Sequence, residues 1–231
     1  KKRRKSRSIV MATLYIVATP IGNLGDISQR ALETLKGVDL ILCEDTRVTK
    51  VLLSRYQIET PTLSYHQHSK LSKVGYIIQL LKEGKNLALV SDAGTPGISD
   101  PGNKLIAEIT GAQPLQITPI PGPSALTAAA SISGFPMDKF VFLGFPPAKN
   151  KRKKFFEEVI NSKHPVVFYE SPFRIIKTLK ELSVFNPQLS VVVCRELTKK
   201  FETIYRGTVE EVLEQLGAEE VRGEFTVIAG K

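Results

Sequence analysis

The stretch SDAGTPGISDPG at residues 91–102 directly follows the apolar run LALV at residues 87–90. It holds three glycines, two prolines and two aspartates in twelve residues. A short strand that ends in such a loop brings backbone N–H groups to the carboxyl edge of a sheet, where open α/β sheets bind their ligands. Glycine allows positive φ and close approach of the backbone, while proline fixes φ and stiffens the loop. The pattern predicts a ligand-binding loop.

A plain turn from strand to helix is the alternative interpretation of this loop. Asp100 followed by Pro101 reads as the N-cap and the first residue of a helix. However, the unit S-D-x-G occurs at residues 91–94 and again at residues 99–102. A simple turn does not need this repetition, which favours ligand binding.

Strand-like and helix-like patterns alternate along nearly the whole chain. Apolar runs predict strands at residues 14–18, 38–43, 87–90, 116–120, 140–143, 166–169, 189–195, 202–206 and 225–229. Helical spacing and caps predict helices at residues 27–36, 48–56, 71–81, 151–161, 173–185 and 209–216, and one from residue 101. The small residues at 121–136 predict a further helix and a domain junction. Such alternation is typical of α/β folds with parallel sheets.

We expect two α/β domains, residues 11–122 and 123–231, with mixed, largely parallel sheets. Clefts between domains are favoured ligand sites, so a cofactor cleft between the two is expected. Four loops of the first half are expected to meet there: residues 19–25, 44–47, 91–100 and 121–125.

The net charge of +9 is concentrated at the start of the chain. Residues 1–10 carry six positive charges and no acid, which leaves 9 − 6 = +3 for the rest. We interpret these residues as a disordered basic arm or a tag. The six are Lys1, Lys2, Arg3, Arg4, Lys5 and Arg7.

Composition argues against a membrane protein and against export. No apolar run approaches the roughly 20 residues of a membrane span, and no signal-peptide stretch follows the basic start. Cys43 and Cys194 each lie in an apolar strand-like run, which predicts buried thiols in a reducing compartment. The expected location is the cytoplasm.

A second basic cluster follows the sequence FPP at residues 145–147, where a loop is expected to enter a helix. Basic loops of this kind can follow phosphates. A lysine-rich helix start that only aids solubility is the alternative. The cluster consists of Lys149, Lys151, Arg152, Lys153 and Lys154.

Several common motifs are missing. The loop at residues 19–25 is not G-x-G-x-x-G, and the chain has no G-x-x-x-x-G-K-[ST] phosphate loop, which disfavours nicotinamide enzymes and P-loop ATPases. The triplet His66-Gln67-His68 has no third ligand at zinc-type spacing, so no metal is expected.

Six motifs together closely resemble the bacterial small-subunit ribosomal RNA ribose-2′-O-methyltransferase I family, of the tetrapyrrole-methylase-like (class III) methyltransferases. They are TPIGNLGDIS at residues 19–28, EDTR at 44–47, SDAGTPGISDPG at 91–102, PGPSA at 121–125, YESPFR at 169–174 and GEFTVIAG at 223–230. The resemblance covers nearly the whole chain from Met11 onward. It implies a homodimer that binds S-adenosylmethionine in the cleft, without a metal, and methylates a cytidine ribose in the decoding region of 16S rRNA.

The implied chemistry is an in-line displacement, in which the protein mainly holds oxygen, methyl carbon and sulfur collinear. The leaving group is a neutral thioether and needs no acid, but the hydroxyl must lose a proton to a carboxylate or water. Candidate catalytic residues are Glu44, Asp45, Asp100 and Glu170. Helix capping is the alternative role for Glu44, Asp45 and Asp100.

Loop position and resemblance together assign the other site residues. Cofactor-binding candidates are Pro20, Ile21, Gly22, Asp92, Ala93, Gly94, Thr95, Ser124, Ala125, Tyr169 and Leu197. Because guanidinium groups and lysines bind phosphate, the substrate-binding candidates are Arg47, Arg174, Lys149, Lys151 and Arg152.

Two other function classes remain open. A methyltransferase of the same fold that acts on a tetrapyrrole or a protein would share the cofactor loops but would not need the basic cluster. A non-catalytic RNA-binding protein would share the basic regions but would not need the cofactor loops. Fold alone cannot separate these.

Overall fold

The computed structural model describes residues 12–66, 69, 71–112, 115–217 and 221–230. The basic arm at residues 1–10 lies outside this part of the chain. Contacts divide the chain into two compact units. Unit 1 comprises the chain up to Pro20 together with Leu24–Gly122, and unit 2 comprises Ile21–Asn23 together with the chain from Pro123 onward.

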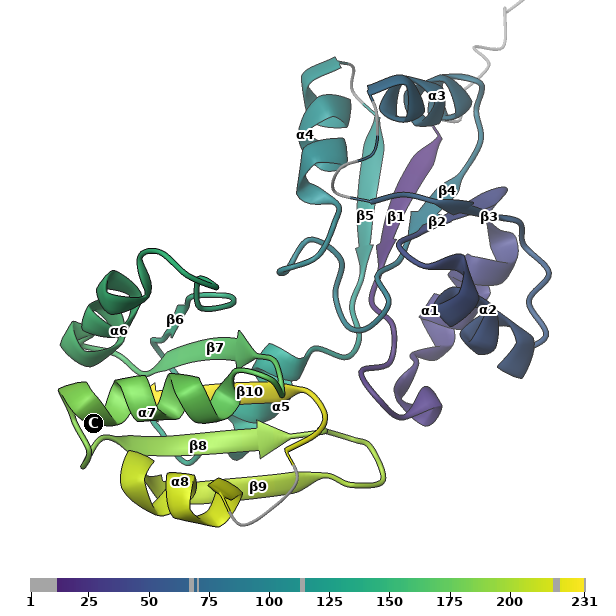
Figure 1. The fold of residues 1–231 in the computed structure, drawn as a ribbon. Coiled ribbons are helices and arrows are strands. Elements are labelled where there is room, and N and C mark those ends of the chain that lie inside the picture. Colours follow the sequence, from purple (N-terminus) through teal and green to yellow (C-terminus); the bar gives the residue numbers. More distant parts are fainter. Residues whose placement is uncertain (1–11, 67–68, 70, 113–114, 218–220, 231) are drawn as a thin grey trace, which may run out of the picture. The chain divides into compact units, whose positions relative to one another are not determined.

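Unit 1 is built on a five-stranded parallel sheet with the order β3-β2-β4-β1-β5 (Figure 1). Its strands are β1 (Thr13–Val17), β2 (Leu40–Cys43), β3 (Thr62–Ser64), β4 (Leu87–Leu89) and β5 (Gln116–Ile120). Its helices are η1 (Leu24–Asp26), α1 (Gln29–Gly37), α2 (Thr46–Arg55), α3 (Leu71–Lys82) and α4 (Asn103–Ala112). The parallel α/β pattern expected from the sequence is confirmed for this unit.

Helices cover both faces of this sheet. One core cluster joins apolar residues of α1 and α2 to Val17, Ile41 and Ala88 of the strands. A second joins residues of α3 and α4 to Leu14 and Leu42, whose side chains point to the other face. Strands buried on both faces read as continuous apolar runs, as in a doubly wound sheet.

Strands β1 and β4 lie side by side at the point where the winding of the sheet reverses. From β1 the chain passes over β4 to reach β2, whereas from β4 it passes over β1 to reach β5. In open α/β sheets, ligands bind beyond the carboxyl ends of the strands at such a point. The loops that follow β1 and β4 are therefore the first place to look for a site.

Unit 2 has a mixed five-stranded sheet with the order β6-β7-β10-β8-β9. Its strands are β6 (Val141–Phe142), β7 (Val166–Glu170), β8 (Ser190–Arg195), β9 (Thr203–Thr208) and β10 (Phe225–Gly230). Its helices are α5 (Ala125–Ile132), α6 (Arg152–Asn161), α7 (Ile175–Phe185) and α8 (Val209–Gly217). Of the four strand pairings among the described residues of this unit, only β6 with β7 is parallel.

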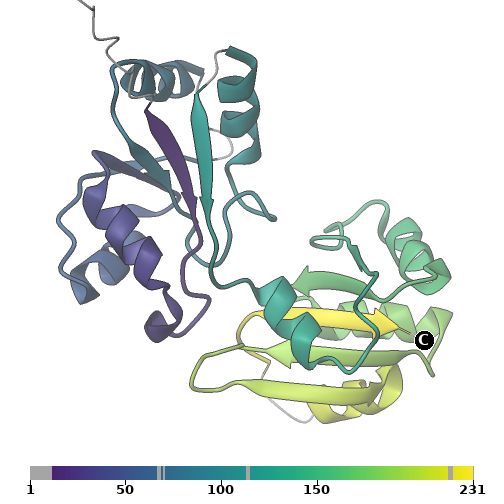
Figure 2. The same ribbon diagram turned by 180° about the vertical axis from the view of Figure 1, so that it is seen from behind.

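The two faces of this second sheet are covered unequally. Helices α6, α7 and α8 pack on one face, against alternate strand residues such as Phe168, Val193 and Val227. Helix α5 packs on the other face (Figure 2). There Ala129 packs with Val167 and Ile228. No helix in the described parts of the chain is long and apolar enough to cross a membrane.

Several details differ from the sequence expectation, among them strand β3 (Thr62–Ser64), which the apolar runs do not predict. Helix α4 begins at Asn103, because Gly102 has φ +147° and its carbonyl accepts the first helical bond from Ile106 N, at 2.9 Å. Pro101 therefore lies before the helix and Asp100 is not its N-cap.

The second sheet is also less parallel than expected. Only residues 196–202 join β8 to β9, too few for the helical crossover that parallel neighbours require.

The short segment Ile21–Asn23 belongs to unit 2 although both of its neighbours along the chain belong to unit 1. The Ile21 side chain is buried and packs with Leu197 and Val192 of the second unit. Asn23 N donates to Thr198 Oγ1 at 3.1 Å. This segment is held by apolar burial as well as by backbone hydrogen bonding.

We predict that Ile21→Ala destabilises the protein by about 2–4 kcal/mol, because it leaves a cavity in a packed core. Urea denaturation followed by circular dichroism measures the change. Ile98→Ala is the control, since Ile98 is an exposed side chain. Equal midpoints for the two variants would contradict the anchoring role of Ile21.

Candidate active site

The loops after β1 and β4 are joined by a pair of backbone hydrogen bonds. Thr19 N donates to Gly94 O at 2.9 Å and Gly94 N donates to Thr19 O at 3.0 Å. The Thr19 hydroxyl also donates to Ser91 O at 3.1 Å. Gly94 has φ +81°, a conformation that glycine adopts at no steric cost. The glycine-rich loop is thus held against the loop that follows β1.

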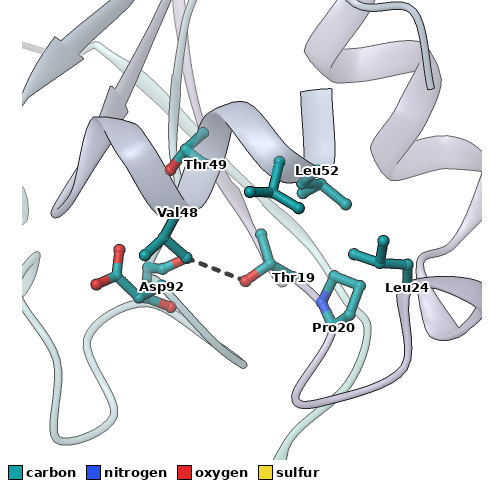
Figure 3. A pocket seen from close by; sticks show the side chains of 9 residues that line it. Thr19, Pro20, Leu24, Val48, Thr49, Leu52 and Asp92 are labelled. Atoms are coloured by element: carbon teal, nitrogen blue, oxygen red, sulfur yellow. Dashed lines mark hydrogen bonds between the residues drawn. The ribbon is translucent and has the colours of Figure 1, made fainter. Parts of the chain in front are cut away.

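A pocket of about 240 Å³ opens beside this junction. Figure 3 shows Thr19 and Pro20 on one side of it, Val48 and Leu52 of helix α2 on another, and Asp92 at its edge. Its walls are mainly apolar side chains, as in most small-molecule sites. The lining residues are Thr19, Pro20, Leu24, Val48, Thr49, Val51, Leu52, Ser91 and Asp92.

Of these lining residues, only Pro20 and Asp92 are candidates from the sequence. Helix α2 supplies four others, which sequence reasoning missed. A signal exists for two of the four, because Val48 and Val51 are apolar yet lie on the exposed side of an amphipathic helix, whereas Thr49 and Leu52 are buried. Exposed apolar residues beside a ligand-binding loop are a reason to suspect a pocket wall.

Three carboxylates gather at this edge of the first sheet. Asp92 Oδ1 accepts a hydrogen bond from Asp45 N at 3.0 Å, which ties the loop after β4 to the loop after β2. Burial raises the pKa of Glu44, the charge of Asp92 raises it further, and His66 partly opposes this. A carboxylate with a raised pKa beside a pocket is suited to accept a proton near neutral pH.

Asp45 has a structural role that the sequence offered as an alternative. It is the N-cap of α2, and its Oδ1 accepts from Arg47 N at 2.8 Å. The Arg47 guanidinium lies 2.6 Å from the same carboxylate. Hydrogen bonds from the Arg47 side chain and backbone lower the pKa of Asp45 to about 2. The Arg47 side chain is 88% exposed, so it stays accessible to a substrate phosphate.

Glu170, a sequence candidate for catalysis, lies in the core of unit 2. Its Oε1 accepts from Ser171 N at 2.7 Å and lies 2.9 Å from Arg174 Nη2, while its Oε2 accepts from the Thr178 hydroxyl at 2.6 Å. The side chain is 0% exposed. Because both oxygens are bonded inside the protein, we assign Glu170 a structural role and do not retain it as a proton acceptor.

Arg174 is held by the same network. Its side chain also donates to Ser171 Oγ at 3.2 Å and to Pro146 O at 3.1 Å. Most of its N–H donors therefore form hydrogen bonds that hold the loops after β6 and β7. This leaves Arg174 a weaker candidate for substrate phosphate than Arg47.

Arg152 is a further correction to the sequence assignment. Its guanidinium donates to Glu181 Oε2, to Pro147 O and to the Thr178 hydroxyl at 2.7, 2.8 and 2.9 Å. The side chain is 8% exposed. It fastens the start of α6 to α7, and Nε, Nη1 and Nη2 each donate to a group of the protein. By contrast, Lys149 and Lys151 are exposed.

The remaining cofactor candidates of unit 2 differ in accessibility. Ile21 and Leu197 are buried together. A Cβ on Gly22 would lie 2.9 Å from Leu197 O, so glycine is needed there for close packing of the chain on itself.

Ser124 precedes α5 without capping it through its side chain. Tyr169 packs between the rings of Phe142 and Phe145. Ala125 begins α5.

In unit 1, Ala93 is exposed and Thr95 and Asp100 are half-buried in the glycine-rich loop.

Among the described residues, no group of three or more His, Cys, Asp or Glu is placed to hold a metal ion. His66 bonds to Ser64 Oγ at 2.8 Å, and Gln67 and His68 lie outside the described residues. The expected absence of a metal stays a prediction, as does the cleft between the two halves.

The family model and two similar relatives point to the same family. A family model described as Tetrapyrrole (Corrin/Porphyrin) Methylases matches residues 13–213. The chain is 48% identical to Ribosomal RNA small subunit methyltransferase I of Mycoplasmopsis pulmonis, over 94% of this chain and 97% of that protein. It is 44% identical to the protein of the same name from Thermotoga maritima, over 94% of this chain and 98% of that protein.

Solved structures show the same fold at low sequence identity. The cobalt precorrin-4 methyltransferase of cobalamin biosynthesis has a TM-score of 0.71 at 20% identity, over 94% of each chain. Diphthine synthase has a TM-score of 0.75 at 13% identity, over 95% of this chain and 90% of that one. At such identities the likeness supports the fold and not the substrate.

We predict that Arg152→Ala lowers the free energy of unfolding by roughly 3 kcal/mol, because Glu181 and Thr178 lose Arg152 as a hydrogen-bond partner. Lys153→Ala is the matched control, since that side chain is 82% exposed. Thermal unfolding measures both. If Arg152→Ala is as stable as the control but binds RNA less well, the structural assignment is wrong.

Proposed function

Because the chain belongs to the tetrapyrrole (corrin/porphyrin) methylase family, we propose that it transfers a methyl group from S-adenosylmethionine to the ribose 2′-hydroxyl of a cytidine in the decoding region of 16S rRNA. The observation that carries the substrate class is the 44–48% identity to relatives named Ribosomal RNA small subunit methyltransferase I, over more than nine-tenths of the chain. The proposed active form is a cytoplasmic homodimer.

The residues of both units fit such a cofactor in chemical type. Unit 1 offers the exposed Asp92 carboxylate and the backbone of a loop with positive-φ glycines. Unit 2 offers Ser124, a half-buried residue that makes no side-chain cap bond to α5. Bound S-adenosylmethionine would supply an electrophilic methyl group on a sulfonium. The proposed contacts are Pro20, Asp92, Ala93, Gly94, Thr95, Ser124, Ala125, Tyr169 and Leu197.

The residues of unit 1 would orient the acceptor and receive its proton. Glu44 is the proposed general base, because its pKa is raised and it adjoins Asp45, whose amide Asp92 fixes. The apolar wall of α2 would exclude water from the reacting hydroxyl. Orientation of this kind can contribute about 7–11 kcal/mol to lowering the barrier, and a positioned base roughly 10²–10⁴-fold in rate.

Arg47, Lys149 and Lys151 are the proposed phosphate contacts. All three are exposed, and Arg47 keeps its charge under all ordinary conditions. The proposal gives no direct contact to the remaining sequence candidates, which are Ile21, Gly22, Asp45, Asp100, Arg152, Glu170 and Arg174.

The function is tested by incubating the protein with S-adenosylmethionine labelled in its methyl group and with small ribosomal subunits or free rRNA. The expected result is label on one cytidine ribose. Calorimetry is expected to show cofactor binding that a chelator does not change. Label on a base, on protein or on no RNA would contradict the proposed function.

We predict that Glu44→Gln lowers the rate of methyl transfer by roughly 10²-fold or more, with little change in cofactor affinity. The wild-type rate should rise with pH through a window above the ordinary carboxyl range, because the raised pKa keeps Glu44 protonated at lower pH. The variant should lose this rise. Glu59→Gln, an exposed acid of the same unit, is the control and should keep both rate and pH profile.

We predict that Asp92→Ala lowers cofactor affinity by roughly 10–100-fold, because the charged Asp92 carboxylate is lost as a hydrogen-bond partner of the cofactor. The fold should stay intact, because Asp92 is exposed. Asp92→Asn separates two roles, since its amide oxygen can still accept from Asp45 N but carries no charge. Calorimetry and circular dichroism measure the outcomes. Loss of folding in Asp92→Ala would instead give Asp92 a structural role.

A further inference from the structure

Two phenylalanines of unit 2 are exposed on neighbouring loops. The Phe173 residue is 96% exposed and Phe145 is 49% exposed. Phe145 follows β6 and Phe173 follows β7, and these parallel strands end at the same edge of the sheet. The loops are tied together, because Tyr169 N donates to Gly144 O at 2.9 Å and Arg174 Nη1 donates to Pro146 O at 3.1 Å.

The turn that presents Phe173 is closed by its own backbone hydrogen bonds. Ser171 O accepts from Arg174 N at 3.1 Å and from Ile175 N at 3.0 Å, and Pro172 fixes its own φ. Beneath the turn, the buried Glu170 carboxylate is paired with Arg174. The ring is therefore held away from the protein core by its own backbone. Such preorganisation lowers the entropy lost when a ligand stacks on the ring.

Unpaired positive charges follow Phe145 on the loop and in the first turn of α6. Lys149, Lys151 and Lys154 are exposed, and none of them forms an ion pair with another described residue. The nearby Pro146 and Pro147 carbonyls accept from the Arg174 and Arg152 guanidinium groups, which fixes the start of this loop. We call Phe145, Lys149, Lys151, Lys154 and Phe173 the aromatic–lysine face.

We propose that the aromatic–lysine face binds an unpaired segment of the substrate RNA, with a base stacked on Phe173 and phosphates held by the three lysines. Stacking on aromatic rings beside a basic surface is how proteins bind single strands without reading their sequence. Bases in a duplex have no free face for such stacking. The inference rests on the proposed function, because it takes rRNA as the substrate, and it adds a docking site outside the reacting centre.

Binding is tested with a fluorescein-labelled single-stranded RNA of ten nucleotides and with the duplex of the same sequence, by anisotropy at several salt concentrations. For Phe173→Ala we expect single-strand affinity to fall roughly 5- to 100-fold, with the salt dependence unchanged because no charge is lost. Phe173→Trp should restore binding. Duplex affinity should be nearly the same for all three proteins.

The triple variant Lys149→Gln, Lys151→Gln, Lys154→Gln should weaken binding and reduce the slope of log affinity against log salt by roughly 2, at about 0.7 for each lost contact. The matched charge control is Lys36→Gln, Lys82→Gln, Lys104→Gln, three exposed lysines of unit 1. Tyr76→Ala is the aromatic control, since Tyr76 is 50% exposed in unit 1. Both controls should bind as the wild type does.

Three outcomes would overturn the proposal. Phe173→Ala could bind the single strand as tightly as the wild type, or no more weakly than Tyr76→Ala. Sedimentation could show that Phe173→Ala changes the oligomeric state while its RNA affinity is unchanged, in which case the face is an interface between copies. Methylation of rRNA by the wild type is measured separately. If the wild type methylates rRNA and Phe173→Ala keeps the wild-type RNA affinity, only the aromatic–lysine face is rejected. If the wild type does not methylate rRNA, the proposed function is rejected.

Discussion

The mutual hydrogen bonds between Thr19 and Gly94 are the constraint on which the first unit's site depends. They hold together the two loops that leave adjacent parallel strands where the winding reverses. Once these loops are joined, Pro20 and Asp92 border the same pocket. Asp92 in turn accepts from the amide of Asp45, which places the loop after β2 and its Glu44 carboxylate at the same edge. The pocket and the position of the carboxylates thus depend on one pair of backbone hydrogen bonds and on one hydrogen bond from a backbone amide to the Asp92 side chain.

The second unit shows how a charged residue in a motif that resembles a functional site can serve the fold. Glu170 and Arg152 are each more than nine-tenths buried, and burying a charge is unfavourable unless its partners are present. Here the partners are Arg174, Thr178 and Glu181. The network fastens the loops after β6 and β7 to α7. Its functional contribution is indirect, because it fixes the backbone that presents exposed residues such as Phe173.

Much of the architecture could be predicted from the sequence, because apolar runs and helical spacing directly reflect burial in a layered fold. The strands at β7 and β10 and the helices α6 and α8 begin or end within about two residues of the expected positions. Pairing direction in the second sheet could not be predicted from the alternation alone. Strand β10 inserts between β7 and β8, a long-range choice that local patterns do not encode.

The sequence by itself determined the family, the glycine-rich loop and the residue types available at the site, since these are local and carried by specific motifs. Only the tertiary structure decided which charged groups face solvent. Arg47 and Arg152 are both arginines beside expected phosphate sites, yet one side chain is 88% exposed and the other 8%. The physical reason is that exposure and pKa depend on neighbours distant in the chain, such as Glu181 for Arg152 and Asp92 for Glu44.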